Sequence, residues 1–196
     1  MRVRKARQDD VAAVAGLLYE SSPQIYDRFA GSGDRARAIL TAAFPESGNV
    51  ASSEVAWVVE LDGRLAAAMT AFPIAEGPQR ARAFIRLALR RVPVWRWGRT
   101  LRLYSAGTQV ARDQSLYIDA LATTPELRRR GAARALLDEA EREARTQGLG
   151  AVTLDTTLDN DAARALYAST GYDEIAYRAP TRALPGFVAL VKRVDR

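Results

Sequence analysis

The chain of 196 residues contains no cysteine and no histidine. Without cysteine it has no disulfide, no thiolate metal site and no cysteine nucleophile. Without histidine it lacks the commonest metal ligand and the commonest general base. We therefore expect no metal site, and proton transfer has to use Asp, Glu, Tyr, Lys or a held water.

Signals for export and membrane insertion are also missing. The chain begins Met1-Arg2-Val3-Arg4-Lys5 and shows no apolar core of about 7–15 residues, which a secretory signal would need. No window approaches the roughly 18 uninterrupted apolar residues of a membrane helix. The expectation is a cytoplasmic protein that has no membrane partner.

Acidic residues are absent from one long segment. Residues 77–112 contain nine arginines and no Asp, Glu or Lys, so this segment carries +9. The formal net charge of the chain is +6, which leaves −3 for the rest. Because the basic charge belongs to one insertion, we expect no nucleic-acid partner. The length and the 48% apolar content fit one domain over residues 1–196 that carries this insertion.

Apolar periodicity and turn residues predict an alternation of strands and helices. Strands are expected at residues 3–6, 54–61, 64–72, 115–122, 151–156, 171–177 and 186–194. Helices are expected at residues 10–19, 23–44 with a break at 31–33, 81–92, 97–111, 130–147 and 161–170. Asp9 and Asp34 are expected as helix N-caps. The strand–helix–strand order in the C-terminal half predicts parallel pairing there.

The segment 115–133 has the pattern of a site for a polyanion. An apolar strand runs into Thr-Thr-Pro-Glu, then three arginines, and then Gly131 and two alanines that open a long helix. The first N–H groups of a helix have no intrahelical partner and point outward at the positive end of the helix dipole. Small residues let a pyrophosphate approach that backbone. A solvated helix start, with no ligand, fits the same short pattern.

A second segment follows about thirty residues later. Its helix carries Asn160, Ala163, Leu166 and Tyr167, and Gly171-Tyr172 comes after it. Tyr167 shares a helical face with the apolar residues and so points inward, where a buried hydroxyl needs a partner. Taken alone, Tyr167 could equally be a core aromatic.

Together the two segments resemble the signature of the GNAT acetyltransferases. The R-x-x-G-x-A run at Arg128, Gly131 and Ala133 matches the family's pyrophosphate motif, and residues 160–172 match its second motif. The resemblance implies an α/β (α+β) fold in which a mixed central sheet of about six to seven strands is covered by helices on both faces. It also implies a splay between the fourth and fifth strands and a helical insertion between the third and fourth.

The resemblance also implies how acetyl-CoA, the acyl donor, would be held. In similar proteins a bulge frees strand backbone to bond the pantetheine arm, and Leu121 N–H would face the thioester oxygen. Tyr167 would donate a proton to the departing thiolate, and Asn160 would lie along the pantetheine. The remaining implied cofactor-binding residues are Ala122, Thr123, Arg128, Arg129, Arg130, Gly131, Ala132, Ala133 and Arg134.

The general base is less clearly marked than the donor site. Asp119 stands two residues before Leu121 in an expected strand, so both side chains should point to one face, near the acceptor amine. Asp119 could instead be a carboxylate that only makes a hydrogen bond at the splay.

The acceptor amine is not identified by the sequence. In similar proteins the early helices and the segment between the third and fourth strands build its pocket. Arg82, Arg86 and Arg90 form a stripe that is either a solvated helix face or a surface for an acidic partner. Four aromatic residues are either pocket walls or core: Tyr26, Phe29, Trp57 and Tyr104.

Three functions remain open at this stage. The first is transfer of an acetyl group from acetyl-CoA to a primary amine of a small molecule or peptide, with no covalent enzyme intermediate. The second is a non-catalytic acyl-CoA-binding or sensor module, since a fold does not determine a function. The third is an anionic-surface binder that uses the arginine-rich insertion. Dimers are common among similar proteins, so a homodimer also remains open.

Overall fold

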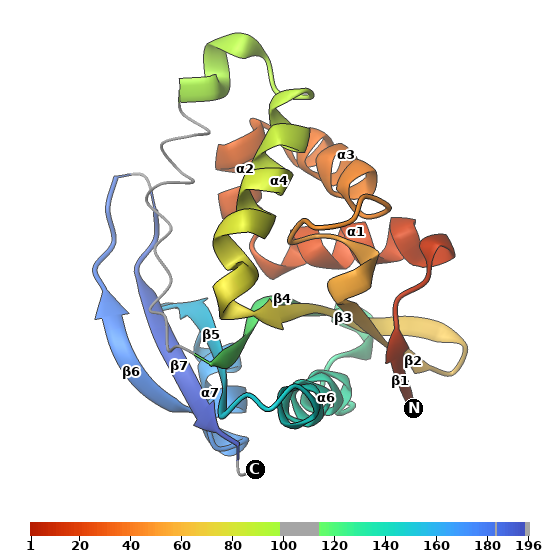
Figure 1. The fold of residues 1–196 in the computed structure, drawn as a ribbon, viewed down its shortest axis with the longest axis vertical. Coiled ribbons are helices and arrows are strands. Elements are labelled where there is room, and N and C mark those ends of the chain that lie inside the picture. Colours follow the sequence, from red (N-terminus) through yellow and green to blue (C-terminus); the bar gives the residue numbers. More distant parts are fainter. Residues whose placement is uncertain (99–113, 183, 195–196) are drawn as a thin grey trace.

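The protein is built around one mixed sheet of seven strands (Figure 1). The computed structural model describes residues 1–98, 114–182 and 184–194. The strands are β1 (Arg2–Lys5), β2 (Ala56–Leu61), β3 (Arg64–Pro73), β4 (Ser115–Thr123), β5 (Ala151–Thr157), β6 (Asp173–Arg178) and β7 (Phe187–Arg193). Their order across the sheet is β1-β2-β3-β4-β5-β7-β6.

Parallel pairing is limited to β4 and β5. The sequence predicted further parallel pairing in the C-terminal half, and here the prediction was wrong. β7 lies between β5 and β6 and is antiparallel to both. A helix does connect β5 to β6, as the alternation indicated, and the two strands run in the same direction without pairing. The last strand fills the space between them.

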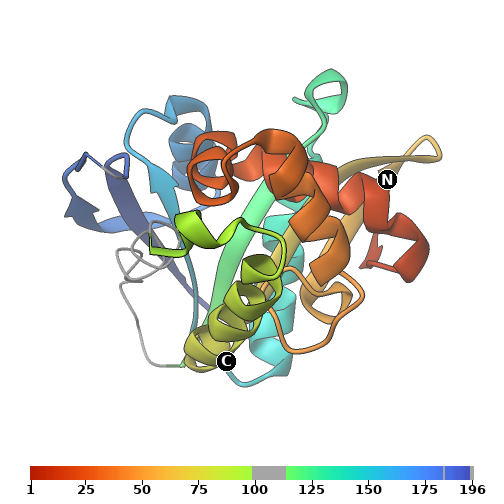
Figure 2. The same cartoon turned by 90° about the horizontal axis from the view of Figure 1, so that it is seen from above.

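Helices cover both faces of the sheet (Figures 1 and 2). The helices of one layer are α1 (Val11–Ser21), α2 (Pro23–Ala30), α3 (Gly33–Ala43) and α4 (Gly77–Leu89). The opposite layer consists of α6 (Ala132–Thr146) and α7 (Asp161–Ser169). Short 3-10 turns lie at Gln8–Asp10, Ser53–Val55, Ile74–Glu76, Val94–Arg96 and Pro125–Leu127.

Each helical layer has its own apolar core against the sheet. Leu136 and Leu137 of α6 are fully buried against β3, β4 and β5. On the other face, Leu18 of α1 and Leu40 of α3 are buried with the small side chains of the sheet. Full burial of one such leucine stabilises the fold by about 1.5–3 kcal/mol. The sheet is therefore held rigidly from both sides, which positions the ends of β4 and β5.

Two helix starts differ from the expected caps. Ser32, not Asp34, caps α3, and its hydroxyl accepts a hydrogen bond from the Arg35 N–H at 3.3 Å. Before α1, the Asp10 carboxylate accepts the Arg7 N–H at 2.7 Å and pairs with Arg4, so Asp9 is not the cap. Before each helix, more than one short polar residue could accept the free N–H groups of the first turn. The direction in which the backbone enters the helix decides which residue does so.

The described part of the insertion is amphipathic. Phe84, Ile85 and Ala88 of α4 are buried, whereas the arginine stripe Arg82, Arg86 and Arg90 is exposed. α4 thus presents a solvated charged face and an apolar inner face. The second predicted helix, at 97–111, lies almost wholly outside the described residues. None of the helices in the described residues combines the length and apolar character that crossing a bilayer would require.

Candidate active site

The site begins where β4 and β5 separate. The two strands pair only over Ser115–Ile118 and Ala151–Leu154. Beyond these residues β4 continues along β3 and β5 continues along β7. A cavity of about 680 Å³ lies in the opening and is lined by both strand ends. The splay expected between the fourth and fifth strands is present.

A bulge on β4 accompanies the separation. Ala71 pairs with Ile118 and Thr70 pairs with Ala120, so Asp119 has no partner residue in β3. The bulge breaks the side-chain alternation that the sequence argument assumed: Ile118 and Leu121 pack against the same core. Leu121, Ala122 and Thr123 line the cavity, and their open strand edge could pair with an extended ligand.

The turn before α6 forms one end of the cavity. Arg129 has φ 62° and Gly131 has φ 84°, both in the left-handed region that favours glycine. This backbone turns sharply into α6, whose first amides, Ala132 to Arg134, lack intrahelical partners. The residues of this turn that line the cavity are Arg128, Arg129, Gly131, Ala132, Ala133 and Arg134.

Arg130 differs from its neighbours in the turn. It is not among the residues that line the cavity, and its guanidinium lies 3.9 Å from the Asp62 carboxylate on the β2–β3 hairpin. The intervening left-handed residue at 129 turns successive side chains in different directions. The arginines of this segment that line the cavity are therefore Arg128, Arg129 and Arg134.

α7 brings the second motif to the same cavity. Asn160 caps this helix, with Oδ1 accepting the Ala163 N–H at 3.2 Å, and it also lines the cavity. Tyr167 is 6% exposed and lines the cavity from the next turns of α7. Burial raises the pKa of Tyr167 to about 12, so the phenol is protonated at neutral pH. The arrangement leaves Tyr167 able to donate a proton into the cavity.

Two carboxylates stand at the point of separation. Asp119 and Asp155 each follow the last residue pair of the parallel strands, and both line the cavity. The Asp119 side chain is accessible from the cavity, but the protein that surrounds the cavity separates its carboxylate from much of the bulk solvent. That burial, and next the charge of Asp155, raise the pKa of Asp119 to about 7. Such a carboxylate changes its charge near neutral pH, which suits a general base.

Asp155 is a site residue that the sequence reasoning missed. Burial raises its pKa, while a hydrogen bond from the Tyr117 hydroxyl at 3.1 Å acts in the opposite direction. The sequence did contain a signal for it, because each of the two strands has one acidic residue: Asp119 in β4 and Asp155 in β5. Only the register of the two strands shows that they come together.

The four aromatic residues named for the acceptor pocket separate into groups. Tyr26 and Phe29 of α2 line a smaller cavity that adjoins the first. Trp57 packs instead against the core beneath β2, under the ammonium group of Lys5. Tyr104 lies outside the described residues.

The fold is shared with solved acetyltransferase structures. One described as an acetyltransferase superposes with a TM-score of 0.73 at 19% identity, covering 100% of both chains. An N-acetyltransferase from Staphylococcus aureus Mu50 gives 0.76 at 18% identity, covering 98% of this chain and 100% of the other. The ribosomal-protein-S18-alanine N-acetyltransferase from Escherichia coli gives 0.58 at 16%, covering 100% and 94%. These similarities define the class of fold.

Family membership follows from the sequence match. The model of the acetyltransferase (GNAT) family matches residues 24–172, which include β4, the turn before α6 and α7. The chain belongs to the GNAT acetyltransferase family. Among curated proteins, none matches the chain by sequence.

Proposed function

We propose that this protein transfers an acetyl group from acetyl-CoA directly to a primary amine. The observation that carries the proposal is the cavity of about 680 Å³ between β4 and β5. It joins an anion-binding helix start, an open strand edge, a buried phenol and a carboxylate. Each of these corresponds to one requirement of acyl transfer from a CoA thioester to an amine.

The turn before α6 supplies the donor-binding features. Arg128, Arg129 and Arg134 bring positive charge to the cavity, beside the unpaired amides of the helix start. A Cβ added at Gly131 would meet no atom within 4 Å, so the approach to this backbone is open. These groups would hold a pyrophosphate, and the edge of Leu121 to Thr123 would hold the pantetheine arm. Acetyl-CoA would supply the activated acyl group.

The residues around the splay would carry the chemistry. Asp119 accepts the proton that the acceptor ammonium has to lose before its nitrogen can attack. The Leu121 N–H donates a hydrogen bond to the acyl oxygen as that oxygen gains negative charge. A carbon–nitrogen bond forms, the carbon–sulfur bond breaks, and Tyr167 gives its proton to the leaving thiolate. The nitrogen then loses its second proton to water, and water returns a proton to Tyr167. Because the amine attacks directly, no enzyme nucleophile is needed, in keeping with a chain that has no cysteine.

Calorimetry and an amine panel test the proposal. Purified protein should bind CoA, and it should release free thiol from acetyl-CoA only when an acceptor amine is present. Mass spectrometry of the acceptor should show one added acetyl group. Binding without transfer to any amine would replace the proposal with the acyl-CoA-binding module, and absence of CoA binding would overturn both.

A further inference from the structure

A second cavity of about 240 Å³ opens beside the first, between α2, α4 and the bulge of β4. The two cavities share Ser21, Ser22 and Asp119 among their lining residues. Asp119 therefore stands at their junction, next to the strand edge where the acyl group would lie. A molecule in the second cavity could present one end to the reaction and keep the rest against the cavity walls.

The walls of this second cavity are mainly apolar. Six of its side chains are hydrocarbon or aromatic: Ile25, Tyr26, Phe29, Val50, Phe84 and Leu184. Phe29 and Phe84 stack with ring centroids 5.9 Å apart, which fixes one wall. Water makes few hydrogen bonds to such walls. An apolar group that replaces this water is removed from solvent, which favours its binding.

The charges around the second cavity have one sign. Among the described residues that line it, none is Arg or Lys, and Asp119 is the carboxylate. The first cavity adds the carboxylates Glu20 and Asp155, and its arginines belong to the turn before α6 and to the start of that helix. Arg178 is close enough to act on Asp155, but it lines neither cavity. The arginine stripe of α4 lies on the exposed face of that helix, opposite Phe84.

Size sets a further limit on the occupant. At about 30 Å³ for each water in the liquid, the second cavity corresponds to roughly eight waters. An acceptor of about that number of non-hydrogen atoms would fill it.

We propose that the acceptor is a compact primary amine with an apolar body and no acidic group, seated in the second cavity with its ammonium at Asp119. This inference rests on the proposed acetyl transfer and names its substrate class. The apolar walls take the body of the amine, and the carboxylate pairs with the ammonium. An acidic acceptor would place a second negative charge beside Asp119, and the arginine stripe of α4 does not line the cavity to offset it.

A panel of related amines tests the class of acceptor. The probes are 2-phenylethylamine, phenylalanine, 1,4-diaminobutane and a peptide with a free amino terminus, each with acetyl-CoA. We expect kcat/KM for 2-phenylethylamine to exceed that for phenylalanine about a hundredfold, because phenylalanine adds a carboxylate to the same skeleton. The diamine should also be poor, because it buries a second charge against apolar walls.

Variants of the second cavity test its location. Ile25→Arg should raise KM for 2-phenylethylamine by at least about tenfold and leave CoA affinity by calorimetry unchanged. Ile25→Ala, a milder change, should shift preference toward the longer 4-phenylbutylamine. Arg86→Ala on the outer face of α4 is the matched control and should leave every value unchanged.

The outcomes separate this inference from the function on which it rests. Transfer to phenylalanine, the diamine or the peptide at equal or higher kcat/KM would overturn the inference and leave the acetyltransferase function intact. Unchanged KM in both Ile25 variants would do the same. Failure to bind CoA, or to acetylate any amine, would overturn both together.

Discussion

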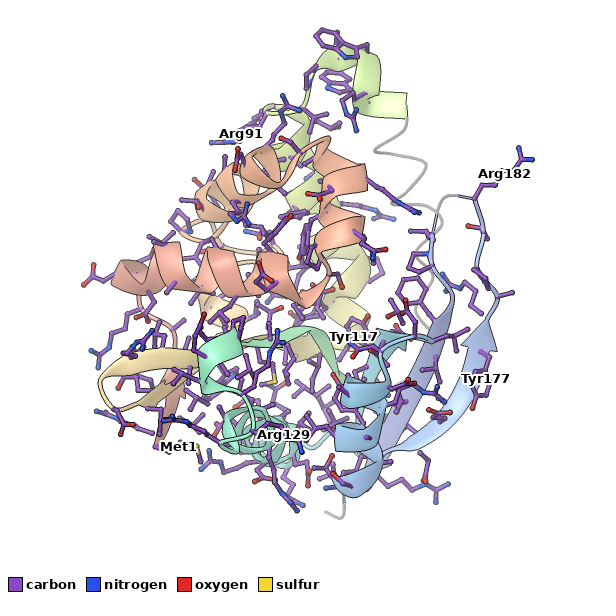
Figure 3. The ribbon with its side chains drawn as sticks, turned by 180° about the vertical axis from the view of Figure 1, so that it is seen from behind. Met1, Arg91, Tyr117, Arg129, Tyr177 and Arg182 are labelled. Atoms are coloured by element: carbon purple, nitrogen blue, oxygen red, sulfur yellow. The ribbon has the colours of Figure 1, made fainter. Side chains whose placement is uncertain are left out.

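The turn at residues 128–134 and helix α4 are both rich in arginine, yet their arginines meet different surroundings. At the turn, Arg128, Arg129 and Arg134 line a cavity next to helix amides that have no partner. On α4, the arginine stripe faces solvent. Figure 3 shows Arg129 beside α6 and Arg91, just past the end of α4, at the far side of the helical layer.

The two regions differ in what accompanies the positive charge. A guanidinium on an open helix face is screened by water and salt, so it contributes little to binding one ligand. At the turn, side-chain charge and backbone N–H donors lie at the same cavity, where they can act together on an anion. Arginine content alone is therefore a poor guide, because both segments are rich in arginine and the turn combines its arginines with unpaired backbone amides.

Matched charge reversals give the largest expected effect. Arg128→Glu with Arg129→Glu should weaken CoA binding about a hundredfold or more, because two charge-assisted hydrogen bonds become repulsions. Arg82→Glu with Arg86→Glu changes the net charge equally and should alter the dissociation constant by less than about twofold. Calorimetry at two salt concentrations measures both. Equal weakening in the two variants would show that overall charge, not the turn, attracts CoA.

Two neighbouring tyrosines extend the comparison from charge to hydroxyl groups. Tyr167 lines the cavity, and its ring centroid lies 5.8 Å from that of Tyr172. The Tyr172 hydroxyl is buried and has no hydrogen-bond partner in the described structure. Tyr167→Phe should lower kcat about a hundredfold with CoA affinity nearly unchanged, because it removes the acid that protonates the thiolate.

Tyr172→Phe is the matched control for Tyr167→Phe. It should keep full activity and raise stability by up to about 1 kcal/mol, since an unpaired buried hydroxyl is lost. Steady-state kinetics and thermal melting test the pair. A kcat for Tyr167→Phe equal to that of the native protein would remove Tyr167 from the mechanism.

The two carboxylates at the splay differ in their expected effect on the pH profile. Asp119 has a pKa of about 7, so kcat/KM should fall as pH drops through 7 and the base becomes protonated. Asp119→Asn should lower the rate at least about tenfold and abolish this acid limb. Asp155→Asn should keep the limb and move it to lower pH, because the Asp155 charge helps to raise the pKa of Asp119. An unaltered profile in both variants would exclude Asp119 as the base.

The smallest expected effect is on stability. The pKa of Asp119 is higher in the folded than in the unfolded chain, so the folded state binds the extra proton between about pH 4 and pH 7. The free energy of unfolding should therefore fall as pH rises through this window. The Asp119→Asn variant should not show this fall, because its amide does not titrate. Asp119→Asn should raise the melting temperature by about 2 °C at pH 8 and by less at pH 5. A larger gain at pH 5 would contradict the pKa.

Much of the lining of the first cavity could be predicted from the sequence because its signals are local. Gly131 and the following helix set the turn, and helical periodicity points Tyr167 inward. Asn160, Leu121, Ala122 and Thr123 also line the cavity. Arg130 does not, because a left-handed neighbour redirects its side chain toward Asp62.

The acceptor side could not be predicted in the same way. The bulge at Asp119 exists only relative to its partner strand β3, and Asp155 meets Asp119 only through the register of β4 and β5. The second cavity combines α2, α4 and β4, which are far apart in the chain. Tyr26 and Phe29 could be named as pocket walls, but no local pattern separated them from Trp57.

The family, the order of strands and helices, and the turn at residues 128–134 could be found in the sequence, because they depend on residues that are neighbours along the chain. The insertion of β7 between β5 and β6, the meeting of two aspartates and the apolar second cavity appear only in the folded structure. The physical reason is that strand register and the packing of distant helices arise from the whole core, which no short segment encodes.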